Sequence, residues 1–101
     1  MTINELLAEM HPGRTIVEDA LRPLGMSVNA LAVELHIPTT RLNEIVRGRR
    51  GVTADTALRL ARYLGPAAQF WLNLQSTYDL KIAEHCKGAT INKQVNPRKA
   101  A

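Results

Sequence analysis

The sequence predicts an all-α fold in a single domain. Leu and Ala dominate an apolar fraction of 46%, and aromatic residues make up only 4% of the 101 residues. Apolar residues recur with the spacing of one helix face, and β-branched and aromatic residues do not form alternating runs. A chain of this length holds one domain, which we expect to span residues 1–101, with an arm at 1–10, a core at 11–85 and a flexible tail at 86–101.

The composition argues against several classes of protein. No apolar run approaches the ~20 residues that a membrane-spanning helix needs, so we expect no membrane partner. The first ten residues carry acids and no basic segment, which is not the pattern of a secretory signal. The single cysteine, Cys86, cannot form an internal disulfide and is compatible with a reducing cytoplasm. We therefore expect a cytoplasmic protein.

The N-terminal part predicts an arm and one helix. Residues 2–10 predict a short amphipathic turn, with four apolar side chains turned inward: Ile3, Leu6, Leu7 and Met10. The run His11-Pro12-Gly13 is expected to break the chain. A helix should follow from about Thr15 to Leu24, in which Pro23 distorts the last turn and Gly25 lies just beyond the end.

Two short helical patterns joined by a tight break occupy residues 28–47. Pro38 keeps Ile37 out of the α region and suits the start of a new helix. Five apolar positions have the spacing that a helix-turn-helix needs to hold its two helices at a steep angle: Leu31, Leu35, Ile37, Leu42 and Ile45. Ala32 is expected where the helices cross, because only a small side chain fits there.

Capping residues and helix-breaking residues predict where the remaining helices begin and end. Ser27 and Thr39 are the expected N-caps of the two motif helices, and Thr53 is the expected N-cap of a helix from Ala54 to about Leu64. A last long helix should run from about Pro66 to Glu84, and it is apolar over more than one face. Beyond it we expect a short extended piece, Thr90 to Val95 at most, and then a disordered end.

Positive charge is concentrated around the second motif helix. The net charge is +4, yet residues 1–35 hold five acids against two arginines, whereas residues 36–63 hold six arginines against two acids. Arginine pairs with phosphate and guanine in a bidentate manner better than lysine does. A basic patch centred on such a helix is typical of a protein that binds nucleic acid.

We predict that this segment binds double-stranded DNA, with the second motif helix as the recognition helix. The side chains expected at base edges are Thr40, Arg41, Asn43, Glu44 and Arg47. Glu44 would accept from cytosine or orient Arg47 or Arg41. The groups expected to hold phosphates are Ser27, Asn29, Thr39, Arg49 and Arg50. An ordinary helical hairpin with a solvated basic face is the alternative.

The sequence offers no set of residues that points to catalysis. The three histidines, His11, His36 and His85, are scattered, and the adjacent pair His85-Cys86 lacks the spacing of metal ligands. We therefore expect no enzyme, no metal, no cofactor and no small-molecule substrate.

Several motifs resemble the HigA antitoxins, a family of small XRE-type, lambda-repressor-like proteins. The similarity runs from His11-Pro12-Gly13 through the helix-turn-helix, Arg50-Gly51-Val52-Thr53 and the run from Thr56 to Ala61. The most specific motif is the run Phe-Trp-Leu-Asn-Leu-Gln at residues 70–75, followed by Tyr-Asp-Leu at 78–80. The resemblance covers residues 11 to about 85. At Arg14 the family often has Glu, so no role is carried over to that position.

The resemblance implies a five-helix domain with a C-terminal dimerisation helix and a short tail. It further implies a repressor of its own operon, and a partner, the HigB toxin, which is a RelE-like ribosome-dependent mRNA endonuclease. A homodimer would place two recognition helices in successive major grooves of an inverted repeat, about 34–36 Å apart. Such a protein would be associated with the nucleoid when bound to its operator.

The surplus apolar stripe of the last helix predicts a partner surface, and the resemblance makes that partner a second copy. The expected dimer residues are Phe70, Trp71, Leu72, Leu74, Tyr78 and Leu80. Most of these side chains would equally suit an ordinary core. Two other functions stay open: a stand-alone XRE-type regulator without a toxin, and a protein-interaction module with weak DNA binding.

Overall fold

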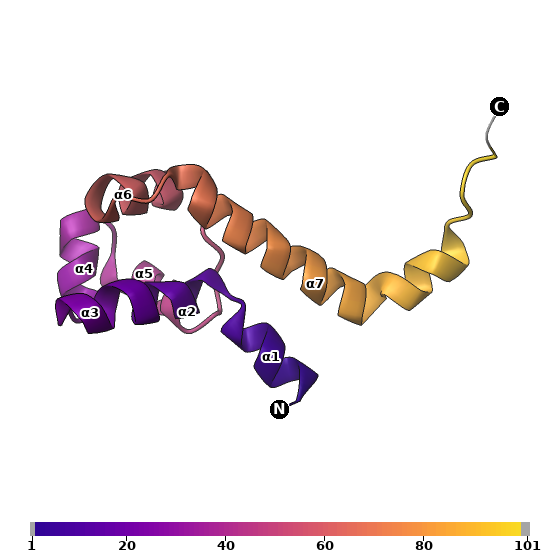
Figure 1. Ribbon diagram of the computed structural model, residues 1–101, viewed down its shortest axis with the longest axis horizontal. Coiled ribbons are helices and arrows are strands. Elements are labelled where there is room, and N and C mark those ends of the chain that lie inside the picture. Colours follow the sequence, from indigo (N-terminus) through magenta and orange to yellow (C-terminus); the bar gives the residue numbers. More distant parts are fainter. Residues whose placement is uncertain (1, 100–101) are drawn as a thin grey trace.

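The computed structural model describes residues 2–99, and within that range the chain is all-helical, as predicted (Figure 1). The elements from α2 to α6 build a compact end, α1 projects from it, and α7 leaves it as a long helix, which gives overall dimensions of 53 × 34 × 21 Å. The first residue of the expected arm and the last two residues of the expected tail lie outside the described residues. No helix among the described residues combines the length and apolar character needed to cross a membrane.

The arm is a helix, α1 (Ile3–Glu9), that begins with a reciprocal cap. The Thr2 hydroxyl accepts a hydrogen bond from the Glu5 backbone N–H at 3.1 Å, and the Glu5 carboxylate accepts one from the Thr2 N–H at 3.3 Å. Leu7 is buried, but Ile3 and Leu6 are each 47% exposed. The expectation that all four apolar side chains turn inward is therefore wrong for these two, because α1 lies against α7 with only one face.

The next three elements form one continuous helix: α2 (Pro12–Ile16), the π-turn η1 (Val17–Leu21) and α3 (Arg22–Leu24). This helix begins at Pro12, so the expected break at His11-Pro12-Gly13 is in fact a helix start. The distortion expected in the last turn lies one turn earlier, in the wide turn η1, because Pro23 has no N–H to bond the preceding turn and its ring crowds the carbonyl four residues before it. Gly25 follows with a φ of 61°, the left-handed conformation predicted for the residue that ends this helix.

The helix-turn-helix consists of α4 (Val28–Leu35) and α5 (Thr39–Val46). Ser27 caps α4 as predicted, since its hydroxyl accepts a hydrogen bond from the Ala30 N–H at 3.0 Å. The prediction of Thr39 as the cap of α5 is wrong. Pro38, extended with φ −61° and ψ 139°, is the N-cap, so Thr39 is already the first helical residue. The proline ring holds this φ without a side-chain hydrogen bond, and the helix therefore starts one residue early.

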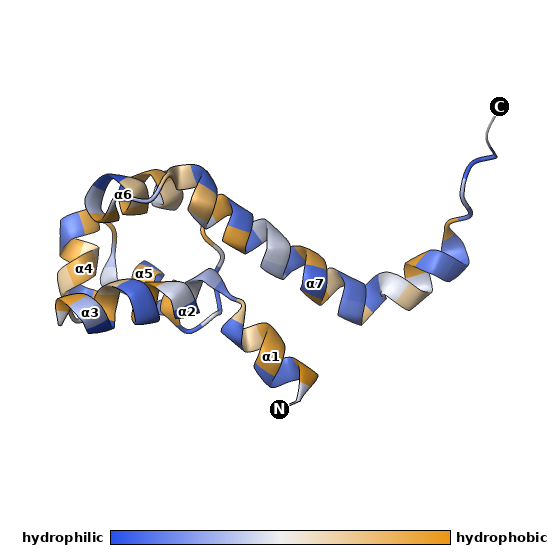
Figure 2. Ribbon diagram, viewed as in Figure 1, coloured by the Kyte–Doolittle hydropathy of each residue, from blue (hydrophilic) through white to orange (hydrophobic). Residues whose placement is uncertain are grey.

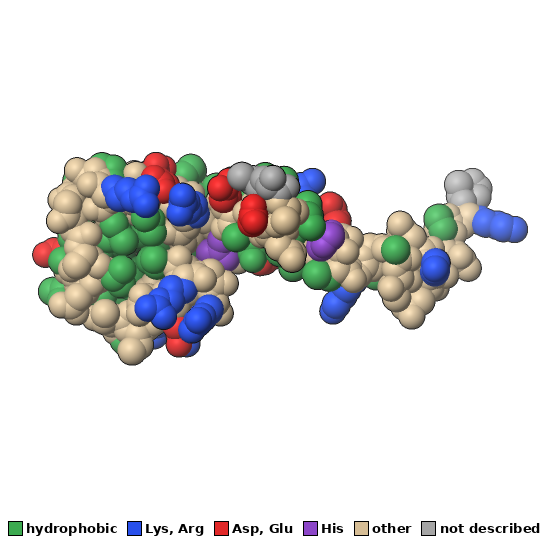
Figure 3. Space-filling view, turned by 90° about the horizontal axis from the view of Figure 1, so that it is seen from below, with side chains coloured by type: hydrophobic (Ala, Val, Ile, Leu, Met, Phe, Trp, Pro, Cys, Tyr) green, Lys and Arg blue, Asp and Glu red, His purple; other side chains and the backbone are tan. Residues whose placement is uncertain are grey.

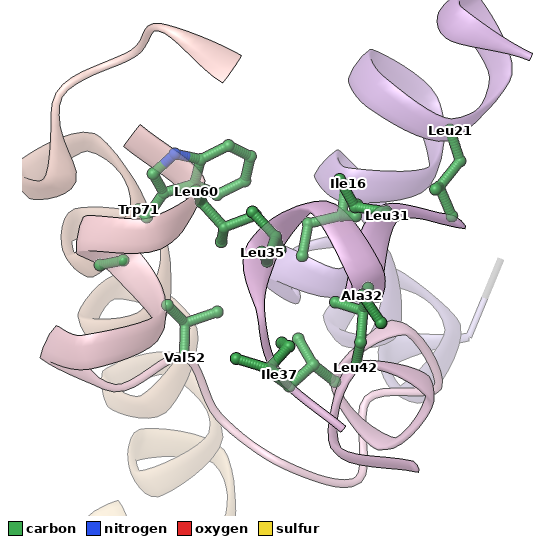
Figure 4. Packing of buried hydrophobic residues seen from close by; sticks show 12 residues of the cluster. Ile16, Leu21, Leu31, Ala32, Leu35, Ile37, Leu42, Val52, Leu60 and Trp71 are labelled. Carbon is green, nitrogen blue, oxygen red and sulfur yellow. The ribbon is translucent and has the colours of Figure 1, made fainter. Parts of the chain in front are cut away.

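The core confirms the apolar pattern of the motif. Leu31, Leu42 and Ile45 are fully buried, and Ala32 is 1% exposed at the crossing of α4 and α5. Leu60 of α6 and Trp71 of α7 lie in the same cluster, next to Leu35 and Val52 (Figure 4). The whole buried cluster comprises Ile16, Leu21, Leu31, Ala32, Leu35, Ile37, Leu42, Ile45, Val52, Ala57, Leu60 and Trp71.

The last two helices are α6 (Ala54–Leu64), capped by Thr53 as predicted, and α7 (Ala68–Gln94). The expectation of an extended piece from Thr90 and of a flexible chain from residue 86 is wrong up to Gln94. The sequence holds no proline there before Pro97, and the single Gly88 costs only about 1 kcal/mol relative to alanine. The second half of α7 is nearly all exposed, and hydrophilic and hydrophobic residues mix along it (Figure 2).

Candidate nucleic-acid interface

Helix α5 buries one face and leaves the other accessible. Leu42 and Ile45 are fully buried against the core, and Val46 packs partly against it. The five candidates for base contacts lie on the remaining surface. Thr40 and Arg47 are exposed, and Arg41, Asn43 and Glu44 are partly exposed. The structure therefore places all five where a ligand can reach them.

Two ion-pair systems hold arginines beside this face. The Glu44 carboxylate accepts a hydrogen bond from Arg50 Nε at 2.7 Å, and Asp55 accepts one from Arg59 Nε at 2.9 Å while Arg41 lies 3.9 Å away. The hydrogen bond from Arg59 lowers the pKa of Asp55. The expectation that Glu44 orients Arg47 or Arg41 is therefore corrected, because its partner is Arg50. Ion pairs exposed to solvent in this way are weak, so these arginines can exchange partners at little cost.

The expected phosphate-binding groups lie around both ends of the motif. The Thr39 hydroxyl donates to Asn29 Oδ1 at 2.7 Å, which links the start of α5 to α4. Ser27 uses its hydroxyl as a cap. Arg49 is exposed, and no ion pair within residues 2–99 holds it or Arg47. Lys and Arg side chains gather in two clusters on the compact end and stand singly along the extension (Figure 3).

Arg59 has a role that the sequence did not reveal. One of its terminal nitrogens, Nη1, donates to the carbonyl oxygens of Leu35 at 3.0 Å and His36 at 3.3 Å. These carbonyls belong to the C-terminus of α4, where His36 takes the left-handed conformation with φ 56°. Arg59 thus satisfies carbonyls that the end of α4 would otherwise leave without hydrogen-bond donors. A cap supplied from 24 residues away leaves no local signal.

Gly13 brings α2 directly onto the backbone of α5. A Cβ at this position would overlap the carbonyl oxygen of Ile45 and would lie 3.0 Å from the Cα of Val46. Gly13 itself is buried. The glycine of the run His11-Pro12-Gly13 thus sets how closely α2 and α5 can approach each other.

His11 joins three parts of the structure around this contact. Its Nδ1 accepts a hydrogen bond from the Gly13 N–H at 2.9 Å and so caps α2, and its ring meets Tyr78 of α7 edge-on at 4.8 Å. The ring is 4% exposed, and burial lowers the pKa of His11, while Asp79 and the backbone of Arg50 act in the opposite direction. A neutral imidazole fits this site, because the cap needs a free lone pair on Nδ1.

The residues expected at a dimer contact divide into inward and outward groups. Trp71 is 2% exposed and belongs to the core, so its assignment to a partner surface is corrected. Leu72 and Leu74 pack partly against the core, and Tyr78 lies partly buried on His11. Among the six candidates, Phe70 at 40% and Leu80 at 59% exposure present the most accessible apolar surface. Most of the apolar side chains in the first half of α7 therefore pack against the core of the same chain.

No group of three or more His, Cys, Asp or Glu side chains lies close enough to hold a metal ion anywhere in residues 2–99. The fold and the free face of α5 instead define a helix-turn-helix protein. A family model described as helix-turn-helix matches residues 17–67. The chain belongs to that family.

The resemblance to HigA-type antitoxins of the XRE class is confirmed by known relatives. Virulence-associated protein I of Dichelobacter nodosus is 57% identical over 83% of this chain and 77% of its own length. An addiction module antidote protein of a HigA family from Coxiella burnetii has 48% identity and a TM-score of 0.83, covering 87% of this chain and 96% of its own. Antitoxin HigA of Pseudomonas aeruginosa, solved with the higBA promoter, has 40% identity and a TM-score of 0.85, covering 88% of this chain and 97% of its own.

Proposed function

We propose that this protein is an antitoxin that represses its own operon by binding an inverted repeat in the promoter as a homodimer. The observation that carries the proposal is the free face of α5, flanked by Arg41, Arg47, Arg49 and Arg50, on a fold whose relative from P. aeruginosa was solved with a promoter. Helix α5 would lie in the major groove, and the dimer would align two such helices with successive grooves.

Base and phosphate contacts divide along the motif in this proposal. Arg41, Asn43 and Glu44 project from the middle of α5 and suit the edges of guanine, adenine and cytosine. Thr40 and Arg47 extend that row toward its two ends. Arg49 and Arg50, in the loop that follows, suit the DNA backbone, together with Ser27, Asn29 and Thr39 at the helix starts. The second copy would dock on the exposed part of α7 around Phe70 and Leu80.

The protein partner in this proposal is a HigB-like, RelE-type toxin that the antitoxin neutralises in a cytoplasmic complex. The second candidate function, a protein-interaction module with weak DNA binding, is favoured by the exposed second half of α7. A stand-alone regulator differs from both in having no toxin. Co-expression with the adjacent reading frame, followed by co-purification, distinguishes the toxin-bound forms from the stand-alone regulator.

The test of DNA binding is fluorescence anisotropy with a duplex from the region upstream of the gene and a random duplex, each at several salt concentrations. Tight, sequence-dependent binding with a steep salt slope supports the repressor. Equal, weak binding to both duplexes contradicts it and favours the interaction module.

Two substitutions separate the contact classes. Arg41→Ala should change base preference, whereas Arg50→Ala should weaken binding to all sequences and flatten the salt slope by about one unit. Arg22→Ala is the matched control, because it removes the same charge from α3, where Arg22 pairs with Glu18 at 2.8 Å. Equal losses on specific and random DNA for Arg41→Ala would refute its role as a base reader.

A further inference from the structure

One side chain of α7 holds the basic loop between α5 and α6. The Val52 backbone N–H donates a hydrogen bond to Gln75 Oε1 at 2.7 Å, across 23 residues of sequence. Gly51 lies so close that a Cβ there would be 3.1 Å from the Gln75 amide group. Val52 itself is 4% exposed, so its N–H depends on this acceptor rather than on solvent.

Asp79 fixes which end of the Gln75 amide faces the loop. Its Oδ1 accepts a hydrogen bond from Gln75 Nε2 at 2.9 Å. An ionised carboxylate can only accept, so the amide must present its nitrogen to Asp79 and its oxygen to Val52. In the reversed orientation Gln75 Oε1 would face the Asp79 carboxylate and Gln75 Nε2 would face the Val52 N–H, so neither hydrogen bond could form.

These groups share one face of α7 with Trp71, at intervals of four residues. Trp71 is anchored in the core, Gln75 follows one turn later and Asp79 one turn after that. The loop is therefore held at both sides: Arg50 is bonded to Glu44 on α5 at 2.7 Å, and Val52 is bonded to Gln75 on α7.

We propose that Gln75, oriented by Asp79, is the positioning residue that places Arg49 and Arg50 for contact with the DNA backbone. This inference rests on the proposed DNA-binding function and adds a control point on α7. A change at Gln75 then alters DNA affinity without any contact between α7 and the DNA.

A charge-neutral exchange of the two side chains tests the proposal. In Gln75→Glu the new carboxylate cannot donate to Asp79, so the two carboxylates repel each other and the side chain at position 75 is no longer held against the Val52 N–H. We expect operator affinity to fall about tenfold, the scale of one lost hydrogen bond. In the double variant Gln75→Glu/Asp79→Asn the new amide donates to the new carboxylate, which still accepts from Val52, and affinity should return to within about twofold of wild type.

The matched control is Gln69→Glu, which adds the same charge on the same helix, where Gln69 donates to Asn73 at 2.8 Å and reaches no loop residue by hydrogen bond. Asp79→Leu, which removes the acceptor of Gln75 Nε2, should weaken binding although it raises the net charge, which on charge alone would strengthen it. Hydrogen exchange at the Val52 amide, measured without DNA, should speed up in Gln75→Glu and slow again in the double variant.

The outcomes separate the two proposals. If the wild-type protein binds its promoter and Gln75→Glu binds as well as Gln69→Glu, the positioning role is wrong and the repressor proposal stands. Failure of the double variant to recover both affinity and amide protection also overturns the positioning role. If the wild-type protein itself shows no sequence-dependent DNA binding, the repressor proposal is wrong.

Discussion

Replacing Gly13 with alanine should destabilise the protein, although Gly13 lies in a helix where alanine is intrinsically favoured. The added methyl group would overlap the Ile45 carbonyl oxygen and press on the Val46 Cα at 3.0 Å. Both atoms belong to the backbone of α5, so no side-chain rotation relieves the contact. Overpacking of this kind costs about 1–3 kcal/mol, while the helix propensity of alanine returns up to about 1 kcal/mol.

We expect a net loss of about 1–2 kcal/mol for Gly13→Ala, or a fall in Tm of roughly 5–10 °C for a domain of this size. Urea unfolding followed by circular dichroism measures the first quantity and a thermal scan the second. Promoter binding should weaken as well, because α5 must shift to admit the methyl group.

Gly88 provides a matched control for the same substitution. It also lies in a helix, α7, but a Cβ there would meet no atom within 4 Å. Gly88→Ala should therefore leave stability unchanged or raise it by up to about 1 kcal/mol. A Gly13→Ala protein as stable as the wild type would refute the close contact between α2 and α5.

Three further predictions concern caps. Burial lowers the pKa of His11 below its ordinary 6.5, so the imidazole is protonated more readily in the unfolded chain than in the folded protein. The free energy of unfolding should therefore fall as the pH drops below about 6.5. Urea unfolding at several pH values should show a weaker dependence of stability on pH for His11→Asn. Arg59→Met keeps most of the aliphatic stem but leaves the Leu35 and His36 carbonyls without their donor, so the free energy of unfolding in urea should fall by about 1 kcal/mol. An unchanged urea midpoint would contradict the role of Arg59 as a cap. Ser27→Ala removes the acceptor for the Ala30 N–H and should cost about 1 kcal/mol, with Ser27→Asp retaining most of the wild-type stability.

Local pattern was sufficient for the helix-turn-helix. The spacing of Leu31, Leu35, Ile37, Leu42 and Ile45 predicted five buried positions, and all five are buried. Periodicity succeeds here because the two helices are adjacent in the chain, so the residues that pack together are close in sequence. The same reasoning located the outward side chains of α5, since they occupy the positions that the buried ones leave.

Helix boundaries were predicted less well where two local signals compete. Pro38 and Thr39 both suit the start of α5, and only the backbone angles show that Pro38 is the N-cap. The last helix was expected to end near Glu84, yet α7 continues through Gly88 to Gln94. One unfavourable residue costs too little to stop a helix whose neighbours favour it.

The sequence by itself determined the fold class, the motif and the basic surface around α5, because each follows from composition or from spacings of a few residues. The tertiary structure alone decided that Gly13 lies on α5, that Arg59 caps α4, that Trp71 is a core residue and that Gln75 holds the loop after α5. Each of these contacts joins residues more than 20 positions apart or depends on which face of α7 meets the core. These contacts depend on close packing between segments that are distant in the sequence, so no local sequence pattern predicts them.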